Sequence, residues 1–338
     1  MNPDQKEKQQ KCLEVNNLST SFYTSAGTIR AVKSVSFSLY KNQCLALIGE
    51  SGAGKSVTSL SIMRMVPSPG KITGGVINMN GNNLLELSGK EFRKLRGDQL
   101  SMMFQDPLAA LNPVITVGDQ IRETILAHQN IGKMEAEEAV LEKLSTLKLP
   151  ANRVYNSYPF QLSGGMRQRA SLAMALILHP KILIADEPTS SLDVTLQGQI
   201  LAELNRQLAD CCLSLLFITH DLAAAASIAN RVAVMYGGII VEEGPVREVF
   251  NYPCHPYTRA LIKSHPSFYR GERLEAIRGN APRTFENISG CPFHPRCDEV
   301  KPLCLDIAPS LRPVDSQRSA ACHLFTIAGN QSVQGSCS

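Results

Sequence analysis

The sequence predicts an α/β fold with a parallel β-sheet at its core. Three short apolar runs, Cys44–Ile48, Ile182–Ala185 and Leu215–Thr219, show no polar alternation, as expected of strands that are buried on both faces. Segments with helical periodicity separate these runs, and strands that alternate with helices form parallel sheets. Short alternating patterns between Leu13 and Leu39 add antiparallel strands to this core.

The elements of the first part of the chain follow one another closely. Residues Ala31–Leu39 alternate as a strand does, and Cys44–Ile48 leads through a glycine-rich turn into a helical pattern at Ser56–Met65. Gly74–Met79 is predicted to be a further strand that ends at the turn Asn80–Asn82. A strand that passes through glycines into a helix places backbone N–H groups at the helix N-terminus, where anions bind.

The middle of the chain, residues 106–170, is predicted to be mainly helical. Val140, Leu144 and Leu147 share one helix face and are surrounded by glutamates, which is the pattern of an amphipathic helix. We therefore expect a helical subdomain inserted into the α/β core.

A hairpin and a change of composition mark the end of the main domain. Arg231–Tyr236 and Ile239–Glu243 are predicted strands, and the Gly237-Gly238 pair between them is typical of a tight hairpin. After about Phe250, Pro, His, Arg and Cys become frequent and periodicity fades, which favours a small domain held by something other than a large core. The expected parts are a flexible N-terminus at 1–12, a main domain at 13–250 and a C-terminal domain at 251–338.

The composition is that of an ordinary globular protein. Of 338 residues, 43% are hydrophobic and 19% are charged, which excludes an intrinsically disordered chain. The formal net charge of +4 neither favours nor excludes nucleic-acid binding. No apolar stretch approaches the roughly 18 residues of a membrane span, and the polar first residues do not resemble a signal peptide. We expect a cytoplasmic protein whose membrane role comes through a partner.

The glycine-rich turn carries a complete phosphate-binding motif. Residues 49–56, GESGAGKS, match the pattern GxxxxGK[ST] between a strand and a helix, which is the context that this P-loop requires. Its glycines let backbone N–H groups surround phosphates. Lys55 is expected to reach the terminal phosphates of ATP, and the Ser56 hydroxyl is expected to bind Mg²⁺. The predicted nucleotide contacts of the motif are Gly49, Ser51, Gly52, Gly54, Lys55 and Ser56.

Two carboxylates follow the apolar run Ile182–Ala185. A carboxylate at the end of a buried strand can hold Mg²⁺ through water, and this role fits Asp186. Glu187 is then placed to orient or deprotonate the attacking water as a general base. An Asp-Glu pair after a strand is also typical of a solvated strand end, and it is the upstream P-loop that favours the catalytic interpretation.

A third motif, Leu162–Met166 with the letters LSGGM, begins a helical pattern. Here the sequence resembles the ABC ATPase family, whose signature motif is LSGGQ; Met166 differs, whereas the serine and both glycines are intact. The resemblance extends to Gln105 as the Q-loop glutamine, Ser191–Asp193 as the D-loop and His220 as the switch histidine. It implies a P-loop NTPase core of the ABC type.

The resemblance also implies that the site is shared between subunits. In this family two ATPase subunits face each other head to tail, and the signature of each closes the P-loop site of the other. Ser163 and its glycines open a helix and so provide a second anion-binding end, whose nucleotide lies in the partner. ATP closes such a dimer and hydrolysis reopens it.

Further roles follow from the same resemblance. His220 contacts the terminal phosphate and completes a catalytic set with Glu187 and Gln105. Gln105 also joins Ser56 and Asp186 at Mg²⁺, and it links the site to the helical segment that touches the membrane partner. Tyr23 is the expected adenine-stacking aromatic, with the adjacent Phe22 as the alternative. The expected nucleotide contacts from the signature and the D-loop are Ser163, Gly164, Gly165 and Asp193.

The C-terminal part resembles one branch of this family. His255–Leu261 is similar to the HPYT-type segment of importer ATPases for oligopeptides and dipeptides, and Arg273–Pro282 and Gly290–Cys297 match that branch as well. The resemblance covers about Leu13–Leu324. It implies a second ATPase subunit, usually a different chain, together with two transmembrane permeases and an extracytoplasmic substrate-binding protein. The expected location is peripheral, on the cytoplasmic face of the inner membrane.

Four cysteines gather in this part of the chain: Cys291, Cys297, Cys304 and Cys322. Disulfides are not expected in the cytoplasm, and soft thiolates suit an iron–sulfur cluster or zinc. The spacing lacks the CxxC pair typical of zinc ribbons. Some members of the branch carry a [4Fe–4S] cluster at matching cysteines, so the resemblance favours a cluster. The alternatives are reduced thiols without metal, or zinc with His294 and His323 as further ligands.

Together these observations predict an ATPase subunit that energises an importer of di- or oligopeptides, with nickel or a metal–chelator complex as the alternative cargo. A soluble ABC ATPase that acts on nucleic acid or ribosomes typically has two tandem nucleotide domains or a long coiled-coil insertion. This chain has one P-loop and a modest helical insertion, so no nucleic-acid partner is expected. Glu187 and His220 argue against a subunit that binds ATP without hydrolysing it.

Overall fold

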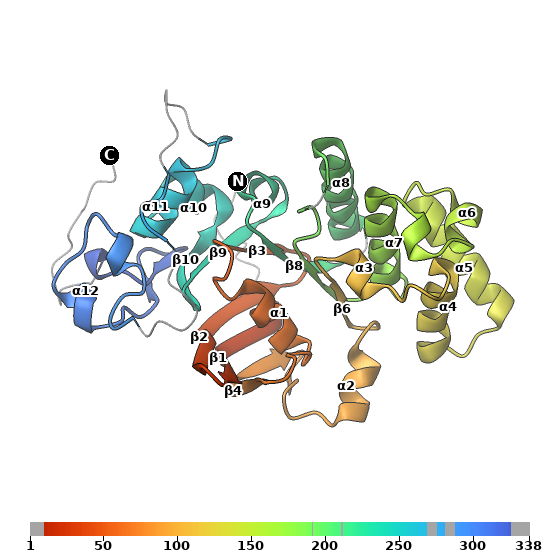
Figure 1. Cartoon of the computed structure of the whole chain (residues 1–338), viewed down its shortest axis with the longest axis horizontal. Helices are drawn as coiled ribbons and strands as arrows, with labels where there is room; N and C mark the ends of the chain where they lie inside the picture. The colour runs from red at the N-terminus through yellow and green to blue at the C-terminus, as the bar shows by residue number, and fades with distance from the viewer. Residues whose placement is uncertain (1–9, 191, 211, 269–275, 281–287, 326–338) are drawn as a thin grey trace, which may run out of the picture. The chain divides into compact units, whose positions relative to one another are not determined.

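The structure, a computed structural model of the chain, describes residues 10–190, 192–210, 212–268, 276–280 and 288–325 (Figure 1). It divides into two compact units that are each discontinuous in sequence. The first unit comprises residues 1–14, 38–44 and 78–219, and the second unit comprises residues 15–37, 45–77 and 220–338. The domain boundaries expected near residues 12 and 250 stay predictions.

The strands build a mixed parallel and antiparallel architecture. They are β1 (Lys11–Thr24), β2 (Gly27–Tyr40), β3 (Cys44–Ile48), β4 (Gly70–Met79), β5 (Asn82–Asn83), β6 (Leu100–Met103), β7 (Ile182–Asp186), β8 (Ser214–Thr219), β9 (Arg231–Tyr236), β10 (Ile239–Pro245), β11 (Arg312–Pro313) and β12 (Ser319–Ala320). In the first unit β7 pairs in parallel with both β6 and β8. In the second unit β3 and β9 are parallel, whereas β9 and β10 are antiparallel. The predicted α/β fold is confirmed.

Helices alternate with many of these strands along the chain and fill its middle part. They are α1 (Lys55–Ile62), α2 (Gly89–Leu95), α3 (Pro107–Ala110), α4 (Val117–His128), α5 (Lys133–Thr146), α6 (Ala151–Tyr155), α7 (Gly164–Leu176), α8 (Val194–Asp210), α9 (Leu222–Ile228), α10 (Val246–Asn251), α11 (Pro256–Lys263) and α12 (Leu303–Asp306), with 3-10 turns at Pro159–Gln161, His294–Arg296 and His323–Phe325. In the first unit α4, α5, α6 and α7 pack together, as Figure 1 shows. Among the described residues, no helix has the length and apolar character needed to cross a membrane.

The core lies in the short apolar strands. Every residue of β3, β7 and β8 is buried, which is why these segments show no polar alternation in the sequence. Burying one large aliphatic side chain contributes about 1.5–3 kcal/mol to the stability of the folded state. The buried strands therefore fix the positions of the residues at their ends. Polar residues that matter for function follow directly where β3, β7 and β8 end.

The hairpin and the four-stranded sheet follow the sequence patterns. Gly237 and Gly238 both have positive φ, at 56° and 88°, as a two-residue hairpin turn requires. A second sheet has the strand order β2-β1-β4-β5. At the C-terminal end β12 pairs with β10, with Glu242 opposite Ala320 and Glu243 opposite Ser319, so the late part of the chain extends the sheet of the second unit.

Strand β6 and helix α2 are among the elements that were not predicted. Strand β6 has only four residues, Leu-Ser-Met-Met, which are too few to show a period although all four are buried. Helix α2 has seven residues with one buried side chain, Phe92. Its sequence signal is a capping box, in which Ser88 accepts the Glu91 N–H and the Glu91 carboxylate accepts the Ser88 N–H.

Candidate functional site

The P-loop lies between β3 and α1, in the second unit. Gly49, Gly52 and Gly54 have φ of 154°, 79° and 105°, values that residues with a Cβ rarely adopt. At Gly49 a Cβ would lie 2.1 Å from the carbonyl oxygen of Met235, so the close approach of β9 also requires glycine there. The loop conformation therefore depends on the glycines that the motif supplies.

Lys55 begins helix α1 and is only 5% exposed. Its Nζ donates to the carbonyl oxygens of Gly49, at 2.8 Å, and Glu50, at 3.1 Å. The ammonium is thus held inside the curve of the loop, at the N-terminal end of α1. This arrangement concentrates positive charge where a phosphate group would sit.

His220 and the first residues of the P-loop line one cavity of the second unit. The cavity has a volume of about 630 Å³, and Gly49, Glu50, Ser51 and His220 form part of its wall. The last residues of α11 and the segment that follows it, including His265, line it as well. The second unit therefore brings the predicted switch histidine and the P-loop to the same cavity.

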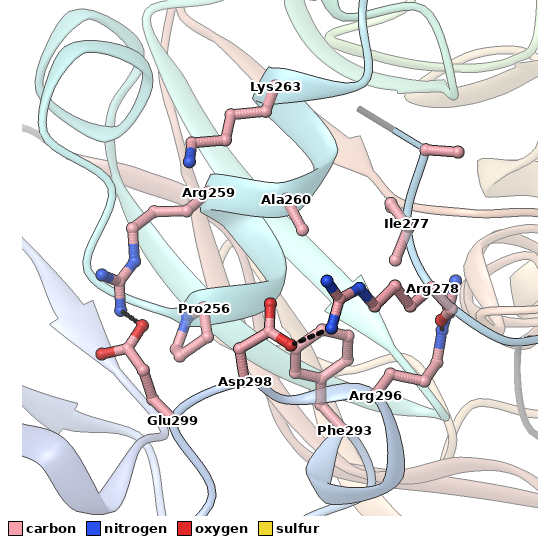
Figure 2. Close-up of a pocket in the computed structure, with 11 residues that line it drawn as sticks. Pro256, Arg259, Ala260, Lys263, Ile277, Arg278, Phe293, Arg296, Asp298 and Glu299 are labelled. Carbon is pink, nitrogen blue, oxygen red and sulfur yellow. Dashed lines mark hydrogen bonds and ion pairs between the residues drawn. The ribbon is translucent and has the colours of Figure 1, made fainter. Parts of the chain in front are cut away.

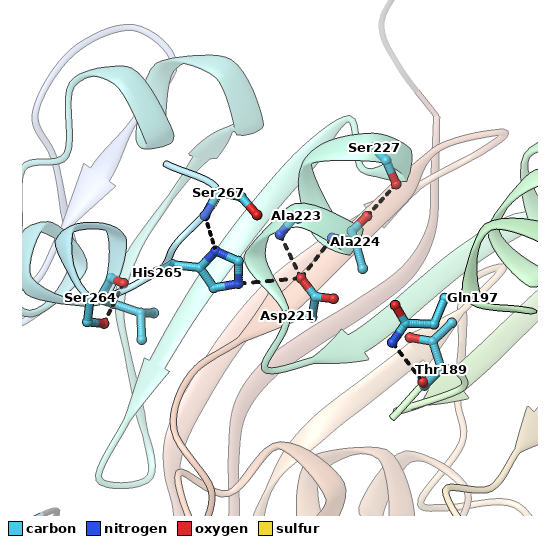
Figure 3. A network of polar contacts seen from close by, with 10 residues as sticks. Thr189, Gln197, Asp221, Ala223, Ala224, Ser227, Ser264, His265 and Ser267 are labelled. Carbon is cyan, nitrogen blue, oxygen red and sulfur yellow. Dashed lines mark hydrogen bonds and ion pairs between the residues drawn. The ribbon is translucent and has the colours of Figure 1, made fainter. Parts of the chain in front are cut away.

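The backbone beyond His220 is fixed by Asp221, as Figure 3 shows. The Asp221 carboxylate caps α9 by accepting the N–H groups of Ala223, at 2.8 Å, and Ala224, at 3.1 Å. The His265 Nε2 atom lies 3.6 Å from the same carboxylate. Because Asp221 caps the start of α9, the backbone directly after His220 is held in place.

Asp186 and Glu187 lie in the first unit, at the end of β7. Asp186 is the last residue of that strand and is 4% exposed, and Glu187 is 8% exposed. Glu187 has φ of 46°, a left-handed conformation that costs a residue with a Cβ about 1–2 kcal/mol. Its N–H donates to the Ile218 carbonyl oxygen at 2.8 Å, which helps to hold this strained backbone. Strain of this kind is characteristic of functional sites.

Gln105 and Glu187 meet directly in the same unit. The Gln105 Nε2 donates to Glu187 Oε2 at 3.0 Å, although the two residues are 82 positions apart. The bond fixes the orientation of the Glu187 carboxylate. The two residues predicted from separate motifs are therefore in contact, and the position of one depends on the other.

The signature motif begins helix α7 as expected. The Ser163 hydroxyl is the N-cap and accepts the Met166 N–H at 3.4 Å. Ser163 and Gly164 are exposed, whereas Gly165 is buried against Leu196, so that a Cβ there would lie 2.6 Å from that side chain. The exposed serine and glycine leave this helix end accessible.

Two glutamines not identified from the sequence bind the chain after Glu187, one from the signature helix α7 and one from α8. Gln168 on α7 donates to the Pro188 carbonyl oxygen at 2.6 Å. Gln197 on α8 donates to the Thr189 carbonyl oxygen at 3.1 Å (Figure 3). The Asp193 carboxylate accepts the Leu196 N–H at 3.0 Å, so it caps α8. The predicted D-loop residue Ser191 lies outside the described residues.

The predicted adenine contact, Tyr23, lies near the end of β1 in the second unit. Tyr23 is 50% exposed and lines a cavity of about 660 Å³ with Thr28 and Arg30. The ring of the alternative, Phe22, lies against Gly70, where an added Cβ would be 2.6 Å from it. Tyr23 is therefore the more accessible of the two rings, and its role stays a prediction.

Three of the four C-terminal cysteines, Cys291, Cys297 and Cys322, have pKa values raised by burial and by neighbouring thiols. Burial, assisted by the charges of the other three thiols, raises the pKa of the Cys322 thiol to about 11. Burial likewise raises the pKa of Cys291 and Cys297, and the Cys291 N–H donates to the Cys304 carbonyl oxygen at 2.9 Å. Even so, the described part of the chain contains no group of three or more His, Cys, Asp or Glu side chains that could hold a metal ion. The structure thus does not support the expected cluster.

The two histidines considered as zinc ligands have other contacts. His294 Nδ1 lies 2.9 Å from the Cys291 carbonyl oxygen, and His323 Nε2 lies 2.8 Å from the Ile307 carbonyl oxygen. Of the predicted segment Arg273–Pro282, the structure describes residues 276–280, and the rest lies outside the described residues.

Comparison with known families gives two matches. The family model described as ABC transporter matches residues 32–190. The model described as oligopeptide/dipeptide transporter, C-terminal region, matches residues 241–304.

Curated relatives match nearly the whole chain. A dipeptide transport ATP-binding protein, DppD, of Bacillus subtilis is 47% identical over 303 residues, which are 89% of this chain and 90% of the relative. An oligopeptide transport ATP-binding protein, AppD, of the same organism is 44% identical over 317 residues, 93% of this chain and 96% of the relative.

A solved structure supports the fold. The dimeric ATP-binding cassette MJ0796 in a post-hydrolysis state bound to ADP and Pi superimposes with a TM-score of 0.64 at 26% sequence identity. The superposition covers 70% of this chain and 99% of that chain.

Proposed function

The chain belongs to the ABC transporter family, and we propose that it binds and hydrolyses ATP to energise the import of dipeptides or oligopeptides. One observation carries the proposal: a C-terminal region of the oligopeptide/dipeptide transporter type follows an ABC domain that has the phosphate and carboxylate motifs and the serine and glycines of the signature. Relatives named as dipeptide and oligopeptide transport ATP-binding proteins favour peptides over nickel or a metal–chelator complex as the cargo.

The proposed chemistry assigns each residue one task. The P-loop N–H groups and Lys55 bind the terminal phosphates of ATP. Ser56, Gln105 and Asp186 would hold Mg²⁺, which neutralises phosphate charge when bound. Glu187, oriented by the 3.0 Å bond from Gln105, takes the proton of the attacking water, and His220 contacts the terminal phosphate.

A second ATPase subunit completes the proposed site. Ser163 and Gly164 are exposed at the start of α7, where a helix N-terminus can meet phosphates held by another chain. The dimeric form of the ATP-binding cassette MJ0796 supports this assembly. We further propose that the partner ATPase is a different chain, and that both dock on two permeases at the cytoplasmic face of the membrane and respond to a substrate-binding protein.

Co-purification tests the assembly. When the chain is purified by an affinity tag from detergent-solubilised membranes, we expect two transmembrane permeases and a second ATPase to accompany it, identified by mass spectrometry. The same purification from cells without the tag is the control. Recovery of ribosomal or nucleic-acid-binding proteins in place of permeases would contradict the importer proposal and favour the soluble class of ABC ATPase.

The cysteine cluster carries a separate proposal, a [4Fe–4S] cluster or, as the alternative, zinc. It is supported by four thiol donors, three of which raise the pKa of the fourth, Cys322, although the side chains as described do not form a metal site. If a cluster is present, protein purified without oxygen should contain about four irons and four acid-labile sulfides per chain. A Cys304→Ser variant should lose both. Metal-free wild-type protein with fully titratable thiols would refute a metal centre.

A further inference from the structure

The second residue of the P-loop, Glu50, is bound by the C-terminal part of the chain. Its backbone N–H donates to the Tyr257 hydroxyl at 2.9 Å. Its carboxylate accepts two bonds from the Arg296 guanidinium, of 2.7 Å to Oε2 and 3.0 Å to Oε1. Tyr257 belongs to the HPYT-type segment and Arg296 to the cysteine-containing segment. Two sequence motifs without a role in ATP chemistry therefore converge on one P-loop residue.

The contact is built into the core of the second unit. Tyr257, Tyr236 and Phe293 are at most 1% exposed, and the Arg296 side chain is 6% exposed. The three rings pack in contact, with centroids 4.5 Å apart for Tyr236 and Tyr257 and 5.3 Å apart for Tyr236 and Phe293. Such packing fixes side-chain positions. The side chains that bind Glu50 are thus held in fixed positions.

Opposite charges strengthen the contact between Arg296 and Glu50. The Arg296 guanidinium donates two bonds to the Glu50 carboxylate and a third to the Tyr236 hydroxyl, at 3.3 Å. Bidentate arginine–carboxylate bonds are charge-assisted and specific in geometry. Arg296 also lies within 6.0 Å of the centroids of the Tyr236 and Phe293 rings, and Figure 2 shows it beside Phe293.

Glu50 is held from the nucleotide side as well. Its carbonyl oxygen accepts the 3.1 Å bond from Lys55, so its N–H, carboxylate and carbonyl are all engaged. A loop held in its binding conformation loses less entropy when ligand binds, and its apparent affinity rises with the fraction of the binding-competent form. Loss of the contacts that hold Glu50 should therefore lower the affinity for MgATP.

We propose that Tyr257 and Arg296 are positioning residues of the ATP site, through which the C-terminal part of the chain holds the P-loop at Glu50 and sets its affinity for MgATP. This inference rests on the proposed function, because it takes the P-loop to be the ATP site. The two residues act through Glu50 and need not touch the nucleotide themselves.

Isothermal titration of the full-length chain with MgATP tests the inference. Arg296→Met should raise the Kd by about 10- to 100-fold, because it removes a charge-assisted bidentate contact. Arg296→Lys keeps the charge but lacks the planar fork, so a smaller rise is expected. Tyr257→Phe, which removes one oxygen from a buried ring, should raise the Kd by about 3- to 10-fold. The double variant Glu50→Gln with Arg296→Met should bind no more weakly than Arg296→Met alone, since both changes break one contact.

Arg278→Met is the matched control. Arg278 pairs with Asp298 at 3.3 Å on the wall of a cavity that Arg296 also lines, where both are exposed (Figure 2), so its loss should leave the Kd within about twofold. Unchanged Kd in Arg296→Lys and Tyr257→Phe, or an equal rise in Arg278→Met, would overturn the inference alone. A wild-type chain that binds no MgATP would overturn the proposed function and the inference with it.

Discussion

Lys55→Ala should reduce the affinity of the chain for MgATP by about 10²–10³-fold. Hydrogen bonds to charged groups contribute about 1.5–3 kcal/mol each, and the ammonium is expected to contact two phosphates. In the structure it is already held inside the loop, 2.8 Å from the Gly49 carbonyl oxygen. Because alanine favours helices, the first residue of α1 should stay helical, and the loss should lie in binding.

Titration with MgATP measures this effect. Lys41→Ala is the control, because Lys41 is an exposed lysine that bonds to Gln10 and lies outside the predicted site. We expect its affinity to equal that of the wild type. An unchanged Kd in Lys55→Ala would show that the P-loop assignment is wrong.

Glu187→Gln should reduce the rate of ATP hydrolysis by about 10²–10⁴-fold, which is the contribution of a positioned general base. Glutamine has nearly the same shape, so it can still accept the bond from Gln105 while it cannot take a proton from water. Binding of ATP should persist, and the ATP-bound, closed pair of ATPases should accumulate. Glu203→Gln, at an ion pair with Arg206 on α8, is the matched control and should hydrolyse ATP at the wild-type rate.

Local motifs explain which parts of the fold and site could be predicted. The P-loop, the buried strands and the Gly237-Gly238 hairpin each depend on residues close in sequence, and the structure has strands, turns and helices where these patterns place them. Strand β6 could not be predicted, because four residues are too few to show a hydrophobic period. It is identified as a strand only through its parallel pairing with β7, which is a tertiary property.

Long-range contacts explain what could not be predicted. The bonds between Glu50 and Arg296 join residues 246 positions apart, and no pattern within either segment indicates the other. The same holds for Gln105 and Glu187, which family resemblance places at one site without stating that one orients the other. The left-handed backbone of Glu187 is also invisible in the sequence, because a glutamate there gives no conformational cue.

The complex isolated through this chain provides the most direct test of an ATPase that drives peptide import. The measurement is its rate of ATP hydrolysis in lipid vesicles, with and without the peptide-loaded binding protein. We predict that the wild-type rate rises when the loaded binding protein is added, whereas the Glu187→Gln complex retains ATP and does not turn over. Equal rates of hydrolysis by the wild-type and Glu187→Gln complexes would contradict an ATPase that drives peptide import. A wild-type rate that the peptide-loaded binding protein does not raise would contradict it as well.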